Sequence, residues 1–210
     1  LVNVFPEVIP LHDRRLAQAW EAVGFDPELI KDPEKLPRIC FGDWVGGDRD
    51  GHPFVTDEVT KETLEILRLN AFVIIRKELI KLIKNISFSC SLSECDEELR
   101  NRIEQIQQEF GEKGEYALKR NKGEAFRQFL NLMMLKLPVD VEREFVTHLH
   151  DNPHVYIYAH ELLDDLKLLK SSLLKYGAKA IAYSDVSESI RIVQTFGFHL
   201  AALDIRQNSA

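Results

Sequence analysis

The sequence predicts a mainly α-helical protein that carries two short β-strands. Apolar residues recur at helical spacing over long stretches, most clearly in residues 57–86 and 159–176. Two short segments have instead the length and the flanking residues of strands: residues 38–45, and residues 200–205, where we expect a buried strand. The chain has 210 residues, of which 45% are hydrophobic, so it is long enough to bury a sizeable core. We therefore expect helices to form most of the structure.

The N-terminal part predicts a helix, a connector and then a strand. Residues 8–23 form an amphipathic pattern that Gly24 ends. Three prolines in residues 26–37 exclude a continuous helix there. The strand over residues 38–45 runs directly into a glycine-rich loop, residues 41–56.

Helices are expected throughout residues 57–197. Asp57 and Glu58 stand where the N-terminus of a helix favours negative charge, and the apolar pattern continues to about residue 86. Ser93, with an acid three residues later, predicts the N-cap of the next helix, and Gly111 and Gly114 interrupt it. The further helices are expected over residues 93–110, 123–137, 139–150, 159–176 and 185–196.

Composition excludes several classes of protein. The net charge of −7 argues against a general nucleic-acid-binding surface, which needs a dense positive patch. No apolar run reaches the length of a membrane span, and no signal peptide is visible. Cys40, Cys90 and Cys95 are too few for a disulfide scaffold and indicate a reducing, cytoplasmic compartment. The chain begins without Met, and we expect both ends to be cuts within a longer protein.

Neither the histidines nor the cysteines predict a reactive centre. His150 and His154 lie four residues apart, but Asn152-Pro153 between them breaks the helix that a metal site with this spacing needs. The other two histidines of this region are His148 and His160. Cys90 and Cys95 are expected to be small buried thiols.

The glycine-rich loop is the first candidate for a binding site. Gly46 and Gly47 come directly before Asp48-Arg49-Asp50, and Gly51 follows. Glycines in such a cluster indicate positive φ angles or a close approach to a ligand. Asp-Arg-Asp places one guanidinium between two carboxylates, which can orient the cation toward an anion. A tight strand-to-helix turn whose charges satisfy one another explains the same residues equally well.

The second candidate is the end of the C-terminal strand, where Arg206 and Gln207 follow Asp204-Ile205. Barrel enzymes collect catalytic groups at the carboxyl ends of their strands. An Arg beside a polar Gln suits a small, multiply charged anion. The alternative for Arg206 is an interior salt bridge to a carboxylate, and the local sequence does not separate the two.

Together these stretches resemble the phosphoenolpyruvate carboxylase family. That family has a Gly-Gly-Asp-Arg-Asp-Gly-Asn-Pro segment preceded by a Trp, which corresponds here to Trp44 and residues 46–53. Further along it has a strand that ends in Asp-(Ile/Val)-Arg-Gln-Glu-Ser, which corresponds to residues 204–209. The order, the spacing and the intervening helices agree, so the resemblance covers essentially the whole chain.

Three positions depart from the family pattern. His52 stands where the family usually has Asn, and Asn208 stands where it often has Glu. Neither change removes an Arg or a glycine, so both are interpreted as variation within the family. Phe54 occupies a position that is often Arg in plant members, so we do not expect regulation by anions at that position.

The resemblance implies a mostly helical enzyme built around an eight-stranded (β/α)8-like barrel. It carboxylates phosphoenolpyruvate with bicarbonate to give oxaloacetate and phosphate, using Mg²⁺ or Mn²⁺. By this resemblance Arg206 is catalytic and binds the phosphoenolpyruvate anion, and no metal is expected to bind within the chain itself. The residues that would line the active site are Gly46, Gly47, Asp48, Arg49, Asp50, Gly51 and Gln207.

The resemblance also implies that residues 1–210 are a single partial domain of a larger enzyme. Residues 41–56 would be a loop at a strand end, residues 57–197 a helical insertion and residues 200–209 a barrel strand. The family's His-Pro-Thr motif does not occur in the sequence, so we expect the chain alone to be inactive. The parent would be a cytoplasmic homotetramer, and the strand edges would favour self-association of the fragment. The competing hypothesis is an acidic helical interaction domain with no catalytic role.

Overall fold

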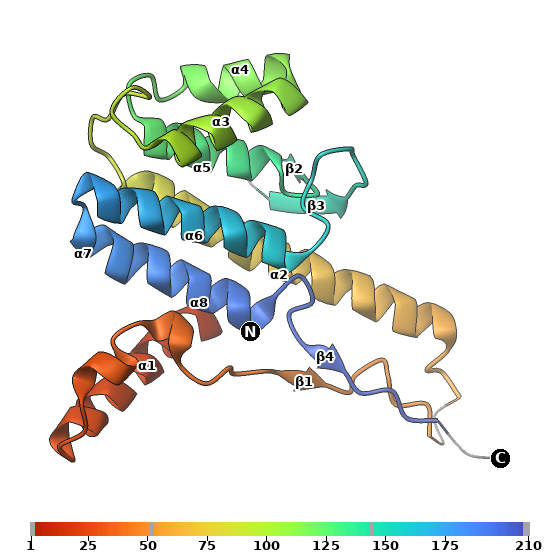
Figure 1. Ribbon diagram of the computed structural model, residues 1–210. Coiled ribbons are helices and arrows are strands. Elements are labelled where there is room, and N and C mark those ends of the chain that lie inside the picture. Colours follow the sequence, from red (N-terminus) through yellow and green to blue (C-terminus); the bar gives the residue numbers. More distant parts are fainter. Residues whose placement is uncertain (1–2, 51–52, 143–144, 208–210) are drawn as a thin grey trace.

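Helix α2 is the longest helix of the described residues, and it packs against α5, α8 and β3 (Figure 1). The computed structural model describes residues 3–50, 53–142 and 145–207. The helical elements are α1 (Phe5–Ala22), η1 (Pro27–Ile30), η2 (Pro33–Lys35), α2 (Asp57–Asn85), α3 (Glu97–Phe110), α4 (Glu112–Lys119), α5 (Ala125–Leu135), α6 (Ala159–Tyr176), α7 (Lys179–Ile181), η3 (Ala182–Val186) and α8 (Ser187–Phe196). The strands are β1 (Gly42–Asp43), β2 (Val139–Glu142), β3 (Phe145–Leu149) and β4 (Ala202–Leu203). The expected mainly α-helical fold is confirmed.

Helix α2 begins where the sequence predicts. The hydroxyl of Thr56 accepts from the backbone amide of Val59 at 3.4 Å, and the first turn is acidic. The helix runs without interruption to Asn85. Its middle, around Ala71 and Phe72, is fully buried, because apolar side chains cover a wide arc of the helix there.

The large core lies between α2, α3, α5, α6 and α8. Apolar side chains from these helices form one continuous buried cluster, which includes Phe72, Phe126 and Phe129. Met133 is fully buried in it, and Met134 packs against it, so both methionines contribute to the core. Burial of this apolar surface is the main term that stabilises the fold.

A second, smaller cluster joins the strands to the helices. It contains Ile9 of α1, Ile74 of α2 and Phe196 of α8. Phe41, which directly precedes β1, stacks on Phe196 with the ring centroids 5.5 Å apart. The start of β1 is therefore held against the end of α8, and α8 in turn leads into β4 (Figure 1).

Strands β1 and β4 pair in parallel, although they are far apart in the sequence. Gly42 lies opposite Ala202, and Asp43 lies opposite Leu203. Both strands are shorter than residues 38–45 and 200–205, over which they were expected. The expectation of a buried C-terminal strand was wrong, because Ile205 is 56% exposed. Strands β1 and β4 form a sheet of two strands, and no other part of the described residues covers the side chain of Ile205.

The helix expected over residues 139–150 was also wrong. Strands β2 and β3 form an antiparallel hairpin there, with Val139 opposite Leu149. Val139-Asp140-Val141-Glu142 alternates apolar and polar residues with the period of a strand, and β-branched residues favour strands. This alternation predicts the strand that the structure shows, and not a helix.

Several helix boundaries differ from expectation. Helix α3 begins at Glu97 after Asp96, so Ser93 is not its N-cap. Instead the carboxylate of Glu94 accepts from the amide of Ser91 at 2.6 Å, which forms a turn before the helix. Gly111 does separate α3 from α4, but Gly114 lies inside α4 and is buried against the backbone of Gln107.

The last helical stretch begins earlier than expected. It starts at Lys179 rather than near Asp185, and it passes through one π-helical segment, η3, before α8. Helix α5 is shorter than the expected 123–137. Helix α1 extends beyond the expected 8–23 at its start and contains Pro10. Among the helices of the described residues, none has the length and apolar character needed to cross a membrane.

Candidate functional site

The glycine-rich loop and the end of β4 lie side by side, joined by backbone hydrogen bonds. The ladder that begins between β1 and β4 continues past both strands. The amide of Arg206 donates to the carbonyl of Gly47 at 3.0 Å, and the amide of Arg49 donates to the carbonyl of Arg206 at 2.9 Å. Asp48 and Arg206 therefore form a parallel bridge. The fold brings together the two candidate sites that the sequence singled out.

Gly47 is required by the close approach of the two chains. A Cβ atom at this position would lie 2.4 Å from the carbonyl oxygen of Asp204 and 3.0 Å from Cγ of Leu203. No side chain fits there while the ladder is intact. A glycine at position 47 allows the backbone after β4 to approach the loop, so packing alone explains why this residue is a glycine.

Gly46 is required by its conformation and by its contact with α2. Its φ is +81°, a region that residues with a Cβ rarely adopt. A Cβ would also overlap the hydroxyl of Thr63. The loop is thus pressed against the second turn of α2.

Arg49 is bound to α2 and not to its neighbouring acids. Its Nη2 donates to the hydroxyl of Thr60 at 3.0 Å, whereas its Nε is buried with no hydrogen-bond partner. Within the described residues, no ion pair joins Arg49 to Asp48 or Asp50. The expected arrangement of a guanidinium between two carboxylates is therefore not formed, and neither is a loop whose charges satisfy one another. Asp48 instead accepts from the amide of Asp50 at 3.2 Å.

The start of α2 carries a negative charge near Arg49. A hydrogen bond from the side chain of Thr56 lowers the pKa of Glu58, and the positive charge of Arg49 lowers that pKa further. Glu58 is exposed, so water screens much of this attraction. Arg49 is the positively charged residue of the glycine-rich loop.

Arg206 points into solvent with a single carboxylate partner. Its Nη2 and Nε lie 3.0 Å and 3.1 Å from Oδ2 of Asp204, and both side chains are more than half exposed. Within the described residues this ion pair lies at the surface and not in the interior. An exposed ion pair of this kind contributes at most about 1 kcal/mol, so an anion can displace the carboxylate at little cost.

The pairing decides which side chains share a face. Residues opposite one another in a parallel ladder project to the same side, so Asp48 and Arg206 share one face. Arg49, the next residue, belongs to the opposite face, where α2 lies. Gln207 and Asp50 are exposed close to this edge. Gly51, His52 and Asn208 lie outside the described residues.

A model of the phosphoenolpyruvate carboxylase family matches residues 1–210, the entire chain. The chain belongs to the phosphoenolpyruvate carboxylase family. It is similar to phosphoenolpyruvate carboxylase 3 of Sorghum bicolor, with 33% identity over 214 residues, which cover 96% of this chain and 21% of that protein. It is also similar to the phosphoenolpyruvate carboxylase of Methylorubrum extorquens, with 32% identity over 100% of this chain and 22% of that protein.

The chain spans about a fifth of the length of the curated relatives that it matches. A third relative, the phosphoenolpyruvate carboxylase of Bradyrhizobium diazoefficiens, is 34% identical over 82% of this chain and 18% of that protein. The two motifs that carry the resemblance in the sequence are those that the ladder joins in space. Membership of the family and the geometry of this edge therefore support each other.

Sequence reasoning missed the threonines at the start of α2, one of which binds the glycine-rich loop. Thr56, Thr60 and Thr63 are spaced at i, i+4 and i+7, which places them on one face of the first turns of α2. Thr60 is 5% exposed, and its hydroxyl donates to the carbonyl of Gly46 at 2.8 Å. Threonines at helical spacing directly after a glycine-rich loop are the signal that would have found them.

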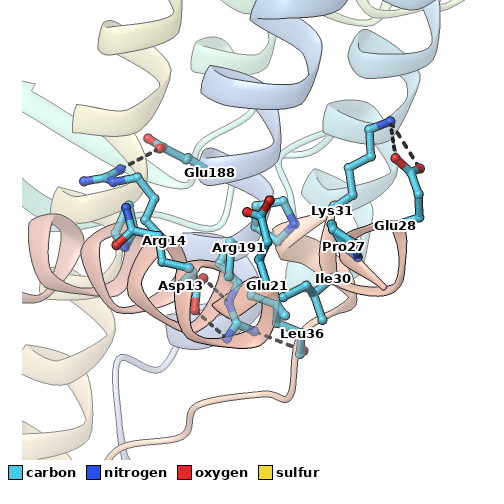
Figure 2. A pocket seen from close by; sticks show the side chains of 14 residues that line it. Asp13, Arg14, Glu21, Pro27, Glu28, Ile30, Lys31, Leu36, Glu188 and Arg191 are labelled. Atoms are coloured by element: carbon cyan, nitrogen blue, oxygen red, sulfur yellow. Dashed lines mark hydrogen bonds and ion pairs between the residues drawn. The ribbon is translucent and has the colours of Figure 1, made fainter. Parts of the chain in front are cut away.

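A buried ion pair holds α8, and so β4, against α1. Arg191 is 2% exposed, and its Nε donates to Oδ2 of Asp13 at 3.0 Å. It also donates to the backbone carbonyls of Leu36 and Pro37. Figure 2 shows Arg191 and Asp13 at the edge of a cavity of about 380 Å³ between α1, η1, η2 and α8. Each guanidinium nitrogen of Arg191 donates to an acceptor within the protein, so we interpret the pair as structural.

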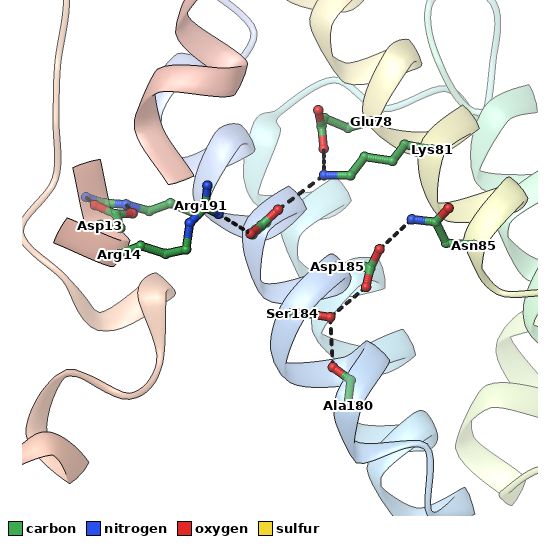
Figure 3. A network of polar contacts seen from close by, with 10 residues as sticks. Asp13, Arg14, Glu78, Lys81, Asn85, Ala180, Ser184, Asp185 and Arg191 are labelled. Atoms are coloured by element: carbon green, nitrogen blue, oxygen red, sulfur yellow. Dashed lines mark hydrogen bonds and ion pairs between the residues drawn. The ribbon is translucent and has the colours of Figure 1, made fainter. Parts of the chain in front are cut away.

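A polar network continues from this pair to α2 (Figure 3). Glu188 of α8 lies 3.3 Å from Arg14 and 3.2 Å from Lys81, and Lys81 also lies 3.8 Å from Glu78. Burial raises the pKa of Glu78, and the nearby Lys81 only partly offsets this rise. At Asp185, burial opposes the shift, but hydrogen bonds from Ser184 and Asn85 prevail and lower the pKa. The network ties α8 to both neighbouring helices.

The histidines and acids of the described residues form no group of three or more that could hold a metal ion. Near the paired motifs, the carboxylate of Asp204 is occupied by Arg206 and that of Asp48 by a backbone amide. His148 and His150 lie on or next to the β2–β3 hairpin, and His160 lies on α6. The residues described here therefore do not make up a complete divalent-cation site.

Proposed function

We propose that this chain is part of a phosphoenolpyruvate carboxylase, which carboxylates phosphoenolpyruvate with bicarbonate to give oxaloacetate and phosphate. The observation that supports this most is the bridge between Asp48 and Arg206, because it joins both family motifs at one edge. The reaction would supply four-carbon acid to the tricarboxylic acid cycle. The chain alone is expected to be inactive, since it spans about a fifth of its relatives.

Arg206 would bind the phosphate group of phosphoenolpyruvate. Its guanidinium is exposed and carries donors in a planar fork, which fits two oxygens of a phosphate. Negative charge moves onto these oxygens as the phosphoryl group is transferred, and a fixed cation stabilises that charge. The substrate would replace the carboxylate of Asp204 as the partner of Arg206.

The glycine-rich loop would line the same mouth. Asp48 projects to the face of Arg206, whereas Gly46 and Gly47 set the path of the backbone. Arg49 is turned toward α2 and would act from the other face, through its positive charge and its backbone. Asp50, Gly51 and Gln207 complete the proposed lining.

The proposed reaction uses Mg²⁺ or Mn²⁺, and its ligands would come from outside this chain. Asp48 and Asp204 of the paired motifs are already engaged, and the described residues hold no group of three or more side chains that could bind a metal ion. We therefore assign no ligand of the cation to the described residues. Bound elsewhere in the parent, the cation would stabilise the developing negative charge.

The parent enzyme would be a homotetramer in the cytoplasm. All three cysteines are free, which fits a reducing compartment. The β1–β4 pair has no further strand beside it among the described residues, so the isolated fragment would tend to self-associate through these edges.

The experiment compares three proteins: the full-length parent, its Arg206→Ala variant and the 210-residue chain. Oxaloacetate formation from phosphoenolpyruvate, bicarbonate and Mg²⁺ is measured by a coupled dehydrogenase assay. We expect activity in the parent, a loss of at least about 100-fold in Arg206→Ala, and none in the chain alone. Circular dichroism checks that the variant is folded.

A folded parent without carboxylation activity would contradict the proposal. The acidic helical interaction domain would then be the remaining hypothesis, and the net charge of −7 would be its main support. An active parent whose Arg206→Ala variant retains full activity would keep the family reaction and remove the role of Arg206.

A further inference from the structure

The hydroxyl of Thr60 fastens the glycine-rich loop to α2 at two points. It donates to the carbonyl of Gly46 at 2.8 Å, and it accepts from Nη2 of Arg49 at 3.0 Å. The same hydroxyl lies 3.1 Å from the carbonyl of Thr56 in its own helix. Thr60 is 5% exposed, so little water competes for these bonds.

The two points held by Thr60 enclose the segment that pairs with Arg206. Both backbone hydrogen bonds of Arg206 are made to this segment, one to the carbonyl of Gly47 and one from the amide of Arg49. Gly46 and Arg49 are the residues that Thr60 contacts, and they stand at the two ends of residues 46–49. One buried hydroxyl thus ties both ends of the segment that pairs with Arg206 to α2.

Neighbouring groups do not duplicate this connection. Thr63 also lies against Gly46, but its hydroxyl donates to the carbonyl of Val59 within α2. Among the described residues, the side-chain hydrogen bonds of Arg206 all go to the exposed carboxylate of Asp204. The direction of its guanidinium therefore depends on how firmly its backbone is held.

We infer that Thr60 is a positioning residue for Arg206 and that it acts through the glycine-rich loop. This inference rests on the proposed function, because the binding of phosphate by Arg206 is itself proposed. Thr60 does not touch the substrate. Without its hydroxyl the loop is released at Gly46 and at Arg49, and the guanidinium loses its fixed place. A displacement of about 1 Å is enough to slow catalysis strongly.

The test uses the full-length enzyme with Thr60→Val and Thr60→Ser. Valine keeps the shape but removes the hydroxyl, whereas serine keeps the hydroxyl. We expect kcat/KM for phosphoenolpyruvate to fall about tenfold in Thr60→Val, as for loss of one hydrogen bond to a charged group, and to stay within about twofold in Thr60→Ser. Thr60→Ala serves for the same comparison if the valine variant does not fold.

Thr195→Val is the matched control. Thr195 is a similarly buried helical threonine, and its hydroxyl donates only to the carbonyl of Arg191 in its own helix, at 2.9 Å. Its replacement should lower the melting temperature slightly and leave kcat/KM within about twofold. This comparison separates the loss of a buried hydroxyl from the loss of the loop contact.

A double-mutant cycle with Arg206→Lys shows whether the effect passes through Arg206. Lysine keeps the charge but lacks the planar fork, so measurable activity should remain. We expect Thr60→Val to cost less than about threefold in the Arg206→Lys background. A full tenfold cost there, or unchanged kcat/KM in the folded Thr60→Val enzyme, would overturn the inference while the parent remains an active carboxylase. A parent without carboxylation would overturn the proposed function and the inference with it.

Discussion

The backbone amide of Arg49 donates to the backbone carbonyl of Arg206 at 2.9 Å, although the whole helical body of the chain separates the two residues. The two arginines are neighbours through their backbones, while their side chains belong to opposite faces. Arg206 faces solvent beside Asp204, and Arg49 is bound to α2. Replacement of Arg49 should therefore disturb the contact between the loop and α2, whereas replacement of Arg206 should remove an exposed positive charge.

Gly47→Ala should separate the two motifs. The added Cβ would lie 2.4 Å from the carbonyl of Asp204, and neither backbone can move without breaking the ladder. Overpacking of this kind costs about 1–3 kcal/mol. We expect a lower urea midpoint and a loss of carboxylation in the full-length enzyme, measured side by side.

Gly42→Ala is the control for that substitution. Gly42 lies in β1, five residues before Gly47, its φ is not positive, and a Cβ there would meet no atom within 4 Å. Alanine also loses less conformational entropy on folding, so this variant should be as stable as the parent or slightly more stable. Equal stability of the two variants would show that the close approach at Gly47 is not a real constraint.

The buried pair between Asp13 and Arg191 should be sensitive to the loss of one partner. Asp13→Asn leaves the guanidinium of Arg191 buried without its carboxylate, which typically costs about 3 kcal/mol. Urea unfolding followed by circular dichroism measures this cost. Because α8 leads into β4, activity should fall as well.

Lys31→Gln provides the comparison for the buried pair. Lys31 lies 3.3 Å from Glu28 on the rim of the same cavity, with both side chains more than half exposed (Figure 2). We expect no measurable change in the urea midpoint, since surface ion pairs contribute little. A similar loss in both variants would mean that burial does not set the strength of these pairs.

The helical body could be predicted from the sequence because its signals are local. The apolar period of residues 57–86 and the glycine after residue 176 each report on one helix. The hairpin at residues 139–149 was missed because a short, mixed pattern is compatible with either kind of element. The alternation of residues 139–142 favours a strand, but the pairing of β2 with β3 depends on a contact between two segments, which a local pattern does not show.

The candidate site could be predicted only in part. The motifs themselves were visible, and their positions at strand ends were expected. The partners of Arg49 and Arg206 were not, because a list of charges does not show which side of a strand each side chain takes. Arg49 was expected between Asp48 and Asp50, yet the turn of the loop directs it to Thr60. A tertiary contact decides the partner of Arg49, whereas Arg206 pairs with Asp204, two residues earlier in the sequence.

Glu78→Gln should stabilise the protein at neutral pH. Burial raises the pKa of Glu78 in the folded state, so between its ordinary and its raised pKa the folded state binds more protons than the unfolded state. Stability therefore falls as the pH rises through that window, and the loss stays complete above the raised pKa. Glutamine stays neutral and keeps an acceptor for Ser189.

The measurement is the urea midpoint of parent and variant between pH 4 and pH 8. The advantage of Glu78→Gln should be present at pH 7 and should shrink as the pH falls toward the ordinary pKa of a carboxyl group. Glu65→Gln, which changes an exposed carboxylate on the same helix, should leave the midpoint unchanged. A variant less stable than the parent at pH 7 would show that the contact with Lys81 outweighs burial.

The three thiols should differ strongly in their reactivity. Burial raises the pKa of Cys90 to about 11 and also raises the pKa of Cys95, whereas Cys40 is exposed. The thiolate is the reactive form, so the two buried cysteines have little of it at pH 8 and are also shielded from reagent. We expect iodoacetamide to label Cys40 at least about tenfold faster than Cys90 in the native protein, as measured by mass spectrometry of the peptides. In urea the three rates should converge, and equally fast labelling of Cys90 in the native protein would mean that the core between α2 and α5 opens readily.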